Sequence, residues 1–202
     1  VDLTSLSMAG NFIGWEIPSE IGNLVNLNVL DLHYNWLSGS LPDEITELGK
    51  LEILDLTYNY LNGTIPQNIG AMSSLIEFRA AIQSDINVDN IGFSGQLPVS
   101  MGLLENVELF EVFYNSLSGE IPSEIGSMSN LYEFNLEYNW LSGTVPSELH
   151  KLESLVDLYL AENDLSGSMP QLICDSGAVI SIDCDVVECD CCECNPLSMA
   201  PN

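Results

Sequence analysis

The chain has 202 residues, and 46% of them are hydrophobic, which is enough apolar side chain to fill a continuous core. Its three basic residues, Lys50, Arg79 and Lys151, stand against thirty acidic ones, for a formal net charge of −27. This charge argues against nucleic acid or an anionic lipid surface as partner and favours cations or basic protein surfaces, although dense charge also simply keeps a protein in solution. Because no apolar run is long enough to cross a bilayer, we expect no membrane insertion by this chain.

A pattern found in residues 51–74 returns every 24 residues along most of the chain. It reads L-x-x-L-x-L-x-x-N-x-L-x-G-x-I-P. One such unit cannot bury its apolar side chains alone, so neighbouring units must stack into a solenoid. The seven copies open at Leu3, Leu27, Leu51, Leu75, Val107, Leu131 and Leu155. We therefore predict one elongated domain of seven repeats over residues 1–173.

Two columns of the repeat restrict the backbone. A buried asparagine can satisfy main-chain groups where a strand ends, and this column is interrupted in the fourth copy. Its members are Asn11, Asn35, Asn59, Asn115, Asn139 and Asn163. Proline fixes φ and removes an N–H, which blocks extension of the strand at one turn in each copy. The prolines are Pro18, Pro42, Pro66, Pro98, Pro122, Pro146 and Pro170.

At these residues the chain resembles the plant-type class of the leucine-rich repeat (LRR) family, in which L-x-G-x-I-P follows the asparagine. The resemblance covers about Leu3 to Ile173. It implies an α/β repeat solenoid, a right-handed superhelix with a parallel β-sheet on the concave side and turns and short 3₁₀ helices on the convex side. It also implies a protein that binds other molecules. Plant-type relatives usually begin with a cysteine-paired cap, so we expect a further segment before Val1.

The early copies carry two departures of interest. In the first copy Trp15 takes the place of the turn glycine, which makes this end of the solenoid aromatic. In the third copy Asn62-Gly63-Thr64 forms a glycosylation sequon in an exposed turn. A glycan on Asn62 is expected if the protein is secreted, although such triplets are also common by chance.

The fourth copy contains an insertion of eight residues at about 83–90, because Val107 follows Leu75 by 32 residues instead of 24. Asp85, Asn87 and Asp89 place oxygen side chains at alternate positions, as in the first half of a Ca²⁺-binding loop. The loop lacks the glycine and the bidentate glutamate of a complete site. A solvated polar insertion is therefore the alternative, and Ca²⁺ is a candidate ligand but not a required cofactor.

Side chains that alternate with the core positions must face outward along each strand, and we expect them to form a rigid concave surface of rings and carboxylates. Tyrosine recurs just before the asparagine and predicts a stripe. Such a surface suits ligand binding, although the rings also pack on one another without any ligand. The candidate ligand-binding residues are Asp31, His33, Tyr34, Asp55, Tyr58, Arg79, Glu111, Phe113, Tyr114, Glu137 and Tyr138.

Aromatic residues also fill two other places in the repeat. Phe78, Phe110 and Phe134 replace leucine at a core position, so we expect an internal row of rings. Trp36, Tyr60 and Trp140 follow the asparagines and extend the aromatic area along one edge, which suits lateral self-association.

Residues 174–202 form a cysteine-rich C-terminal cap and tail. A solenoid end exposes core side chains and an open strand edge, so a cap is physically required. Six cysteines allow fifteen pairings, and disulfides are favoured over a thiolate metal site in an extracellular protein. They are Cys174, Cys184, Cys189, Cys191, Cys192 and Cys194. The tail is similar to those that close plant-type repeat proteins of microalgae.

The sequence shows no catalytic grouping. His33 and His150 fall in unrelated places of the repeat, and no nucleophile–base pair or phosphate-binding glycine loop is present, so we predict that this chain is not an enzyme. The leading hypothesis is an extracellular recognition module, secreted or at the cell surface, that binds a protein, peptide or glycan, either free or as a receptor ectodomain. The alternatives are a structural subunit of an extracellular assembly and, by family analogy alone, an inhibitor of cell-wall-degrading enzymes.

Overall fold

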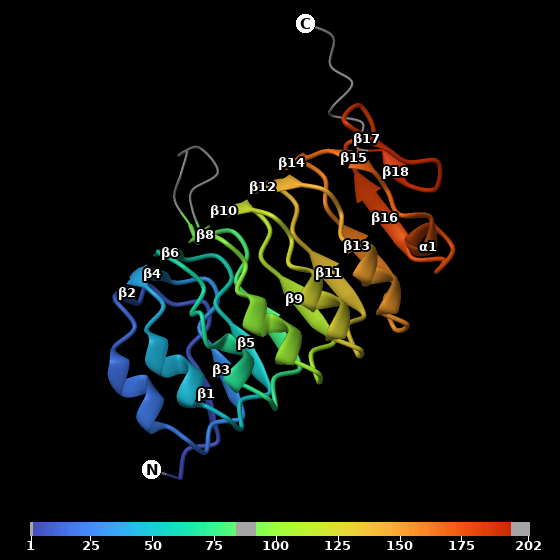
Figure 1. Ribbon diagram of the computed structural model, residues 1–202. Helices are drawn as coiled ribbons and strands as arrows, with labels where there is room; N and C mark the ends of the chain where they lie inside the picture. Colours follow the sequence, from blue (N-terminus) through green and yellow to red (C-terminus); the bar gives the residue numbers. More distant parts are fainter. Residues whose placement is uncertain (1, 84–91, 195–202) are drawn as a thin grey trace, which may run out of the picture.

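The computed structural model describes residues 2–83 and 92–194, which form a curved row of coils stacked side by side (Figure 1). Parallel strands line one side of the row and short helices line the other. Each coil is one copy of the repeat, and its leucines meet those of the next coil in a single core. The predicted repeat solenoid is therefore confirmed.

The main sheet contains nine parallel strands in chain order. Leu30 pairs with Leu54, and Leu54 pairs with Phe78, so each column of the repeat becomes a straight row across the sheet. The last two strands come from the cysteine-rich region and extend the sheet beyond the repeats. The strands are β1 (Ser5–Ser7), β3 (Val29–Asp31), β5 (Ile53–Asp55), β7 (Glu77–Arg79), β9 (Leu109–Glu111), β11 (Glu133–Asn135), β13 (Asp157–Tyr159), β16 (Val179–Ile182) and β18 (Glu193–Cys194).

In most copies a short strand begins just after the asparagine, and these strands pair in parallel with one another. The sequence analysis predicted only turns at this place. The two sheets that these strands form are joined by an isolated bridge between Thr64 and Ser94. Glycines at positive φ lie at or near the ends of several of these strands, such as Gly39 at 73° in β4, because the backbone must turn there. The strands are β2 (Gly14–Trp15), β4 (Trp36–Ser40), β6 (Tyr60–Asn62), β8 (Ser94–Gly95), β10 (Ser116–Gly119), β12 (Trp140–Gly143) and β14 (Asp164–Leu165), with β15 (Gly167–Ser168) paired to β17 (Val187–Glu188) nearby.

Proline begins the helix of nearly every coil. Its fixed φ suits the start of a helix, and its carbonyl accepts the first bond, as from the Ile45 N–H to Pro42 O at 3.0 Å. Within residues 2–83 and 92–194, six elements are 3₁₀ helices, and α1 takes the equivalent place after Pro170. The helices are η1 (Ser19–Asn23), η2 (Asp43–Glu47), η3 (Ile69–Ala71), η4 (Val99–Leu103), η5 (Ser123–Ser127), η6 (Ser147–Lys151) and α1 (Gln171–Cys174).

The predicted internal row of rings is present. Phe78, Phe110 and Phe134 are fully buried. The rings of Phe78 and Phe110 stack with centroids 4.8 Å apart, and Phe134 meets Phe110 edge-on at 5.8 Å. Phe93, just after the insertion, is a further buried ring that the sequence analysis did not assign to the core.

The amide ladder continues through the fourth copy, where the sequence predicted a gap. The Gln83 side chain donates to Leu56 O at 2.8 Å and accepts from the Leu61 N–H at 3.2 Å, as the asparagines do in other copies. Gln83 therefore belongs to the coil, and the insertion begins after it. The predicted Ca²⁺ ligands Asp85, Asn87 and Asp89 lie outside the described residues, so that site stays a prediction.

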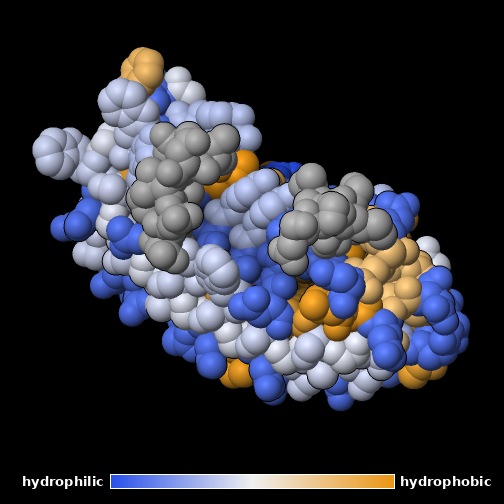
Figure 2. All heavy atoms as spheres, turned by 90° about the horizontal axis from the view of Figure 1, so that it is seen from above, coloured by the Kyte–Doolittle hydropathy of each residue, from blue (hydrophilic) through white to orange (hydrophobic). Residues whose placement is uncertain are grey.

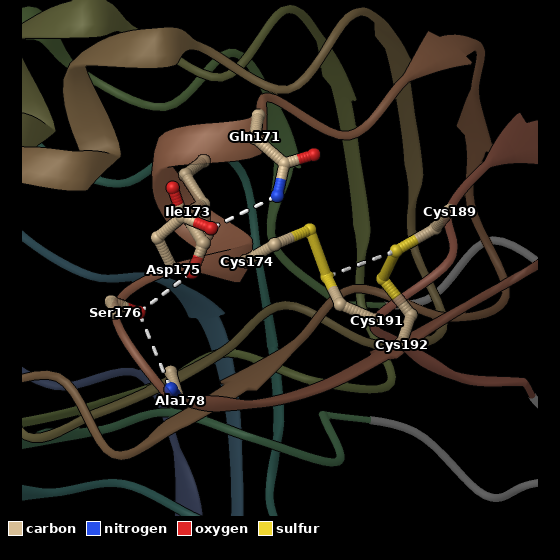
Figure 3. The surroundings of a disulfide bond; sticks show 9 residues. All are labelled: Gln171, Ile173, Cys174, Asp175, Ser176, Ala178, Cys189, Cys191 and Cys192. Atoms are coloured by element: carbon tan, nitrogen blue, oxygen red, sulfur yellow. Dashed lines mark hydrogen bonds between the residues drawn. A yellow bond between two sulfur atoms is a disulfide. The ribbon is translucent and has the colours of Figure 1, made fainter.

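Three disulfides staple the C-terminal cap, and they join Cys174 to Cys191, Cys184 to Cys194, and Cys189 to Cys192. Figure 3 shows the first of them tying the end of α1 to the last segment of the cap, with the third beside it. All six cysteines are therefore paired, as in the disulfide alternative of the sequence analysis.

Candidate recognition surface

The outer face of the main sheet presents rows of half-buried side chains held in register. In β3 the middle residue, Leu30, is fully buried, so its neighbours Val29 and Asp31 face outward. One row contains Ser7, Asp31, Asp55, Arg79, Glu111, Asn135 and Tyr159. The sequence analysis missed the parallel row of Val29, Ile53, Glu77, Leu109, Glu133 and Asp157, which the same period-two alternation would have identified.

Arg79, the single arginine of the chain, lies in the middle of this face. Its guanidinium contacts the carboxylate of Glu77 on the same strand, and its Nε lies 3.3 Å from Glu111 Oε2 on the next strand. One positive charge is thus shared between two carboxylates.

The C-terminal half of the face carries an acidic patch, which we define as Glu111, Glu133, Glu137 and Asp157. Burial raises the pKa of the Glu111 carboxyl, with Glu133 adding to the effect, and burial followed by the charge of Asp157 raises the pKa of Glu133. Burial also raises the pKa of Glu137, although the Ser181 hydroxyl donates to its Oε1 at 2.8 Å and opposes the shift. In the described part of the chain, Glu111 is the one member of the patch with an ion pair, to Arg79, and an incoming cation would supply a partner for the other three.

The phenol of Tyr159 lies within this patch. Burial raises its pKa, and the charges of Asp157, Glu133 and Glu137 add to the shift. Tyr159 therefore remains a neutral hydrogen-bond donor and ring among carboxylates.

Lowering the pH from 7 to about 5 is expected to raise the thermal unfolding midpoint. Glu111, Glu133 and Glu137 have raised pKa values in the folded chain, so their stabilising contribution is complete below the unfolded pKa and is lost as pH rises through the folded values. The pKa of Asp31 is lowered, and the stability that it contributes is lost only at more acidic pH. Thermal scans across this pH range measure the effect.

The variant Glu133→Gln should show a weaker pH dependence than the parent chain. Repeating both scans at high salt removes the general repulsion of a chain with net charge −27, which acts in the same direction. A midpoint that falls steadily between pH 7 and about 5 would contradict the expected direction.

The tyrosine stripe lies where the chain leaves the main sheet. Tyr34, Tyr58, Tyr114 and Tyr138 all have positive φ between 51° and 55°, which turns their rings to the edge of the sheet. They stack in two pairs, with centroids 4.2 Å apart for Tyr34 and Tyr58 and 4.0 Å apart for Tyr114 and Tyr138. Ile82, which is buried, interrupts the stripe between the pairs.

Ring stacking and exposure coexist in this stripe. Tyr34 is 53% exposed and Tyr58 is 40% exposed, so each pair still offers a face to solvent. Burial, followed by the contact with Tyr114, raises the pKa of Tyr138 to about 12. The predicted Phe113 is half-buried on the sheet face and meets the Tyr114 ring edge-on at 6.0 Å.

A groove of about 370 Å³ runs beside the first pair of tyrosines. Tyr34 and Tyr58 line it together with Trp36 and Tyr60, the residues two places later in each copy. Phe12 packs edge-on against Trp36 with centroids 5.2 Å apart. Seen from above, the surface is mostly blue and white, and its orange apolar side chains lie in separate patches (Figure 2).

Asp31, His33 and Asp55 lie together at the N-terminal half of the concave face. The His33 Nδ1 is 2.5 Å from Asp31 Oδ1 and 3.8 Å from Asp55 Oδ2.

The predicted glycan acceptor Asn62 is exposed in β6. Among the described residues, no helix combines the length and the apolar character needed to cross a membrane.

The Leucine Rich Repeat family model matches residues 2–24, 26–48, 50–72 and 130–152. No curated protein matches the chain in sequence. Among solved structures, the LRR ectodomain of the receptor kinase SOBIR1 from Arabidopsis thaliana is 31% identical, with a TM-score of 0.60, and the match covers 67% of this chain and 70% of that ectodomain.

Two larger plant receptors are also similar. The LRR ectodomain of the membrane receptor kinase GASSHO1/SCHENGEN3 from Arabidopsis thaliana, in complex with CASPARIAN STRIP INTEGRITY FACTOR 2, is 34% identical with a TM-score of 0.77 over 87% of this chain and 20% of that one. The Arabidopsis receptor kinase HAESA, in complex with the peptide hormone IDA and the co-receptor SERK1, is 33% identical with a TM-score of 0.75 over 90% and 29%. The chain thus spans less than a third of either receptor chain.

Proposed function

Because the chain belongs to the leucine-rich repeat family and to its plant-type class, we propose that it is an extracellular recognition module whose concave sheet binds a peptide or protein segment with basic side chains. The observation that supports this most is the acidic patch, four carboxylates in or beside the rows of a rigid sheet, of which only Glu111 has an ion pair among the described residues. The three disulfides suit an oxidising, extracellular compartment.

The similar receptors support binding as the activity of this surface. HAESA was solved with a peptide hormone, and GASSHO1/SCHENGEN3 was solved with CASPARIAN STRIP INTEGRITY FACTOR 2. This chain has the same kind of parallel sheet, preformed and held by backbone hydrogen bonds, so little ordering would be required when a ligand binds.

The charge of the face favours a basic ligand over a neutral or acidic one. Glu111 is the sole member of the acidic patch paired to Arg79, and Glu133 and Asp157 repel each other across neighbouring strands. An arginine or lysine side chain placed between them would relieve this repulsion and gain charge-assisted hydrogen bonds. Tyr159, whose phenol lies among these carboxylates, offers a ring face to the same cation.

A peptide-display selection on the immobilised chain tests the proposal. We expect the enriched peptides to be rich in arginine and lysine, and we expect the double variant Glu133→Gln/Asp157→Asn to bind them at least about tenfold more weakly, which corresponds to about 1.4 kcal/mol. The matched control is Glu47→Gln/Asp43→Asn, which removes the same charge from exposed residues of η2 on the convex side.

The control separates site binding from attraction to overall charge. If both double variants bind the peptides equally weakly, the effect comes from net charge and the concave site is wrong. Enrichment of peptides without basic residues would contradict the proposed ligand class. Thermal unfolding of each variant must match the parent chain for the comparison to hold.

A further inference from the structure

A second group of polar side chains converges at the other end of the concave face, away from the acidic patch. Asp31 ends β3, Asp55 ends the neighbouring β5, and His33 follows Asp31 by two residues. Sheet register pairs Asp31 with Asp55, and alternation places His33 on the same face. One ligand atom from each of the three side chains lies within 4.8 Å of the other two.

Groups outside the trio hold its carboxylates in place. The Ser7 hydroxyl donates to Asp31 Oδ2 at 2.9 Å, which leaves Oδ1 toward His33. The Thr57 N–H donates to Asp55 Oδ1 at 3.0 Å, which leaves Oδ2 as the oxygen nearer the imidazole. The His33 main-chain N–H also donates to Asp31 Oδ1 at 3.3 Å, so Asp31 is anchored through both oxygens and Asp55 through one. Outer partners orient metal ligands in this way.

A buried polar atom without a partner lies next to the group. Thr57 occupies the same place in the third copy as His33 does in the second. The Tyr34 N–H donates to the Thr57 carbonyl oxygen at 2.9 Å. In the described part of the structure its Oγ1 is buried and has no hydrogen-bond partner. A water molecule held by a cation at Asp31, His33 and Asp55 would donate a hydrogen bond to this hydroxyl oxygen.

An ion pair between His33 and Asp31 accounts for only part of this arrangement. It leaves the second carboxylate, Asp55, 3.8 Å from the same Nδ1. Arg79, on the next strand, is already shared between Glu77 and Glu111. Two carboxylates and one imidazole thus face a common point with less positive than negative charge.

We propose that Asp31, His33 and Asp55 bind a divalent transition-metal ion of the Zn²⁺ class. One imidazole nitrogen with two carboxylate oxygens suits Zn²⁺ and its neighbours, whereas Ca²⁺ and Mg²⁺ prefer oxygen alone. Ligand atoms about 2.1 Å from a tetrahedral ion lie about 3.4 Å from one another. The present separations of 2.5 and 3.8 Å lie on either side of that value, so small rotations of the side chains would complete the site.

The ion would bind at the surface and not inside a closed cage. The side chains of Asp31, His33 and Asp55 are 23%, 35% and 18% exposed, so the remaining coordination position faces the concave side. Water or a donor group of a bound molecule can occupy that position. The site requires no peptide ligand, and its test is independent of the acidic patch.

Equilibrium dialysis of the chain against Zn²⁺ tests the proposal, with excess Ca²⁺ present because a chain of net charge −27 attracts any cation. We expect one Zn²⁺ per chain to resist Ca²⁺, and we expect His33→Ala and Asp55→Asn each to weaken binding at least about tenfold. The matched controls are His150→Ala on η6 and Asp43→Asn on η2, which change the same residue types at exposed places and should bind as the parent chain does.

A spectroscopic readout identifies the nitrogen ligand. With Cu²⁺ as the probe, electron paramagnetic resonance should show coupling to one nitrogen, and this coupling should vanish in His33→Ala and persist in His150→Ala. Retained Zn²⁺ in His33→Ala, or complete displacement of Zn²⁺ by Ca²⁺ in the parent chain, overturns the proposal. Thermal unfolding without metal confirms that each variant is folded, so loss of binding reports the site itself.

Discussion

Replacing Asn59 by alanine is expected to lower the free energy of unfolding by about 3 kcal/mol, since the buried Leu37 N–H loses its partner and two buried carbonyls each lose one of two side-chain donors. The Asn59 side chain is buried, with 2% exposure for the residue. Its Nδ2 donates to Leu32 O at 3.0 Å and to Leu56 O at 2.9 Å, and its Oδ1 accepts from the Leu37 N–H at 3.0 Å. One amide thus connects two successive coils.

Urea denaturation of Asn59→Ala measures this loss, and Asn68→Ala is the matched control. Asn68 precedes η3, is exposed, and makes no capping hydrogen bond through its side chain, so its replacement should change stability by less than about 0.5 kcal/mol. If Asn59→Ala loses no more than the control, water can replace the amide and the ladder does not stabilise the stack of coils.

The repeat made the fold predictable, because one period fixes both the core columns and the register between coils. Leu30, Leu54 and Phe78 follow one another across the sheet as the 24-residue spacing requires. The prediction of the amide column failed at Gln83. The sequence analysis looked for asparagine in that column, and the insertion next to Gln83 hid the register of the repeat. Glutamine is one methylene longer, yet it reaches the equivalent carbonyl, Leu56 O, from the same row.

The candidate sites were less predictable than the fold. Asp31, His33 and Asp55 were identified as outward residues, but their convergence depends on rotamers and on anchoring by Ser7 and Thr57, which the repeat pattern does not encode. Glu133 was missed because we did not follow the first outward row. The pairing of the cysteines depends on how the cap folds back over the last coil, so composition left all fifteen pairings open.

The concave face therefore has two chemically different halves. Arg79 and Glu77 on β7 lie between them. They separate Asp31, His33 and Asp55 from the acidic patch. A ligand that spans the face would meet nitrogen and oxygen donors at one end and carboxylates with raised pKa at the other. This asymmetry would fix the direction in which a peptide lies.

The second large effect is expected in the internal row of rings. Phe110→Ala should lower the free energy of unfolding by about 4 kcal/mol, because it removes a fully buried ring and leaves a cavity that rigid neighbouring coils cannot close. Phe110 lies between Phe78 and Phe134 and contacts both rings, so the loss includes two aromatic contacts in addition to the buried area. Urea denaturation of parent and variant measures the change.

Phe110→Leu is the matched variant, and the repeat itself predicts its outcome. Leu30, Leu54 and Leu158 fill the same column in other coils and are fully buried there, so the coil geometry accepts leucine. We expect a loss of less than about 1.5 kcal/mol for this change in shape. A loss as large as that of Phe110→Ala would mean that the three rings act as a unit, and that the fourth to sixth coils are stabilised by aromatic packing beyond the leucine pattern common to all copies.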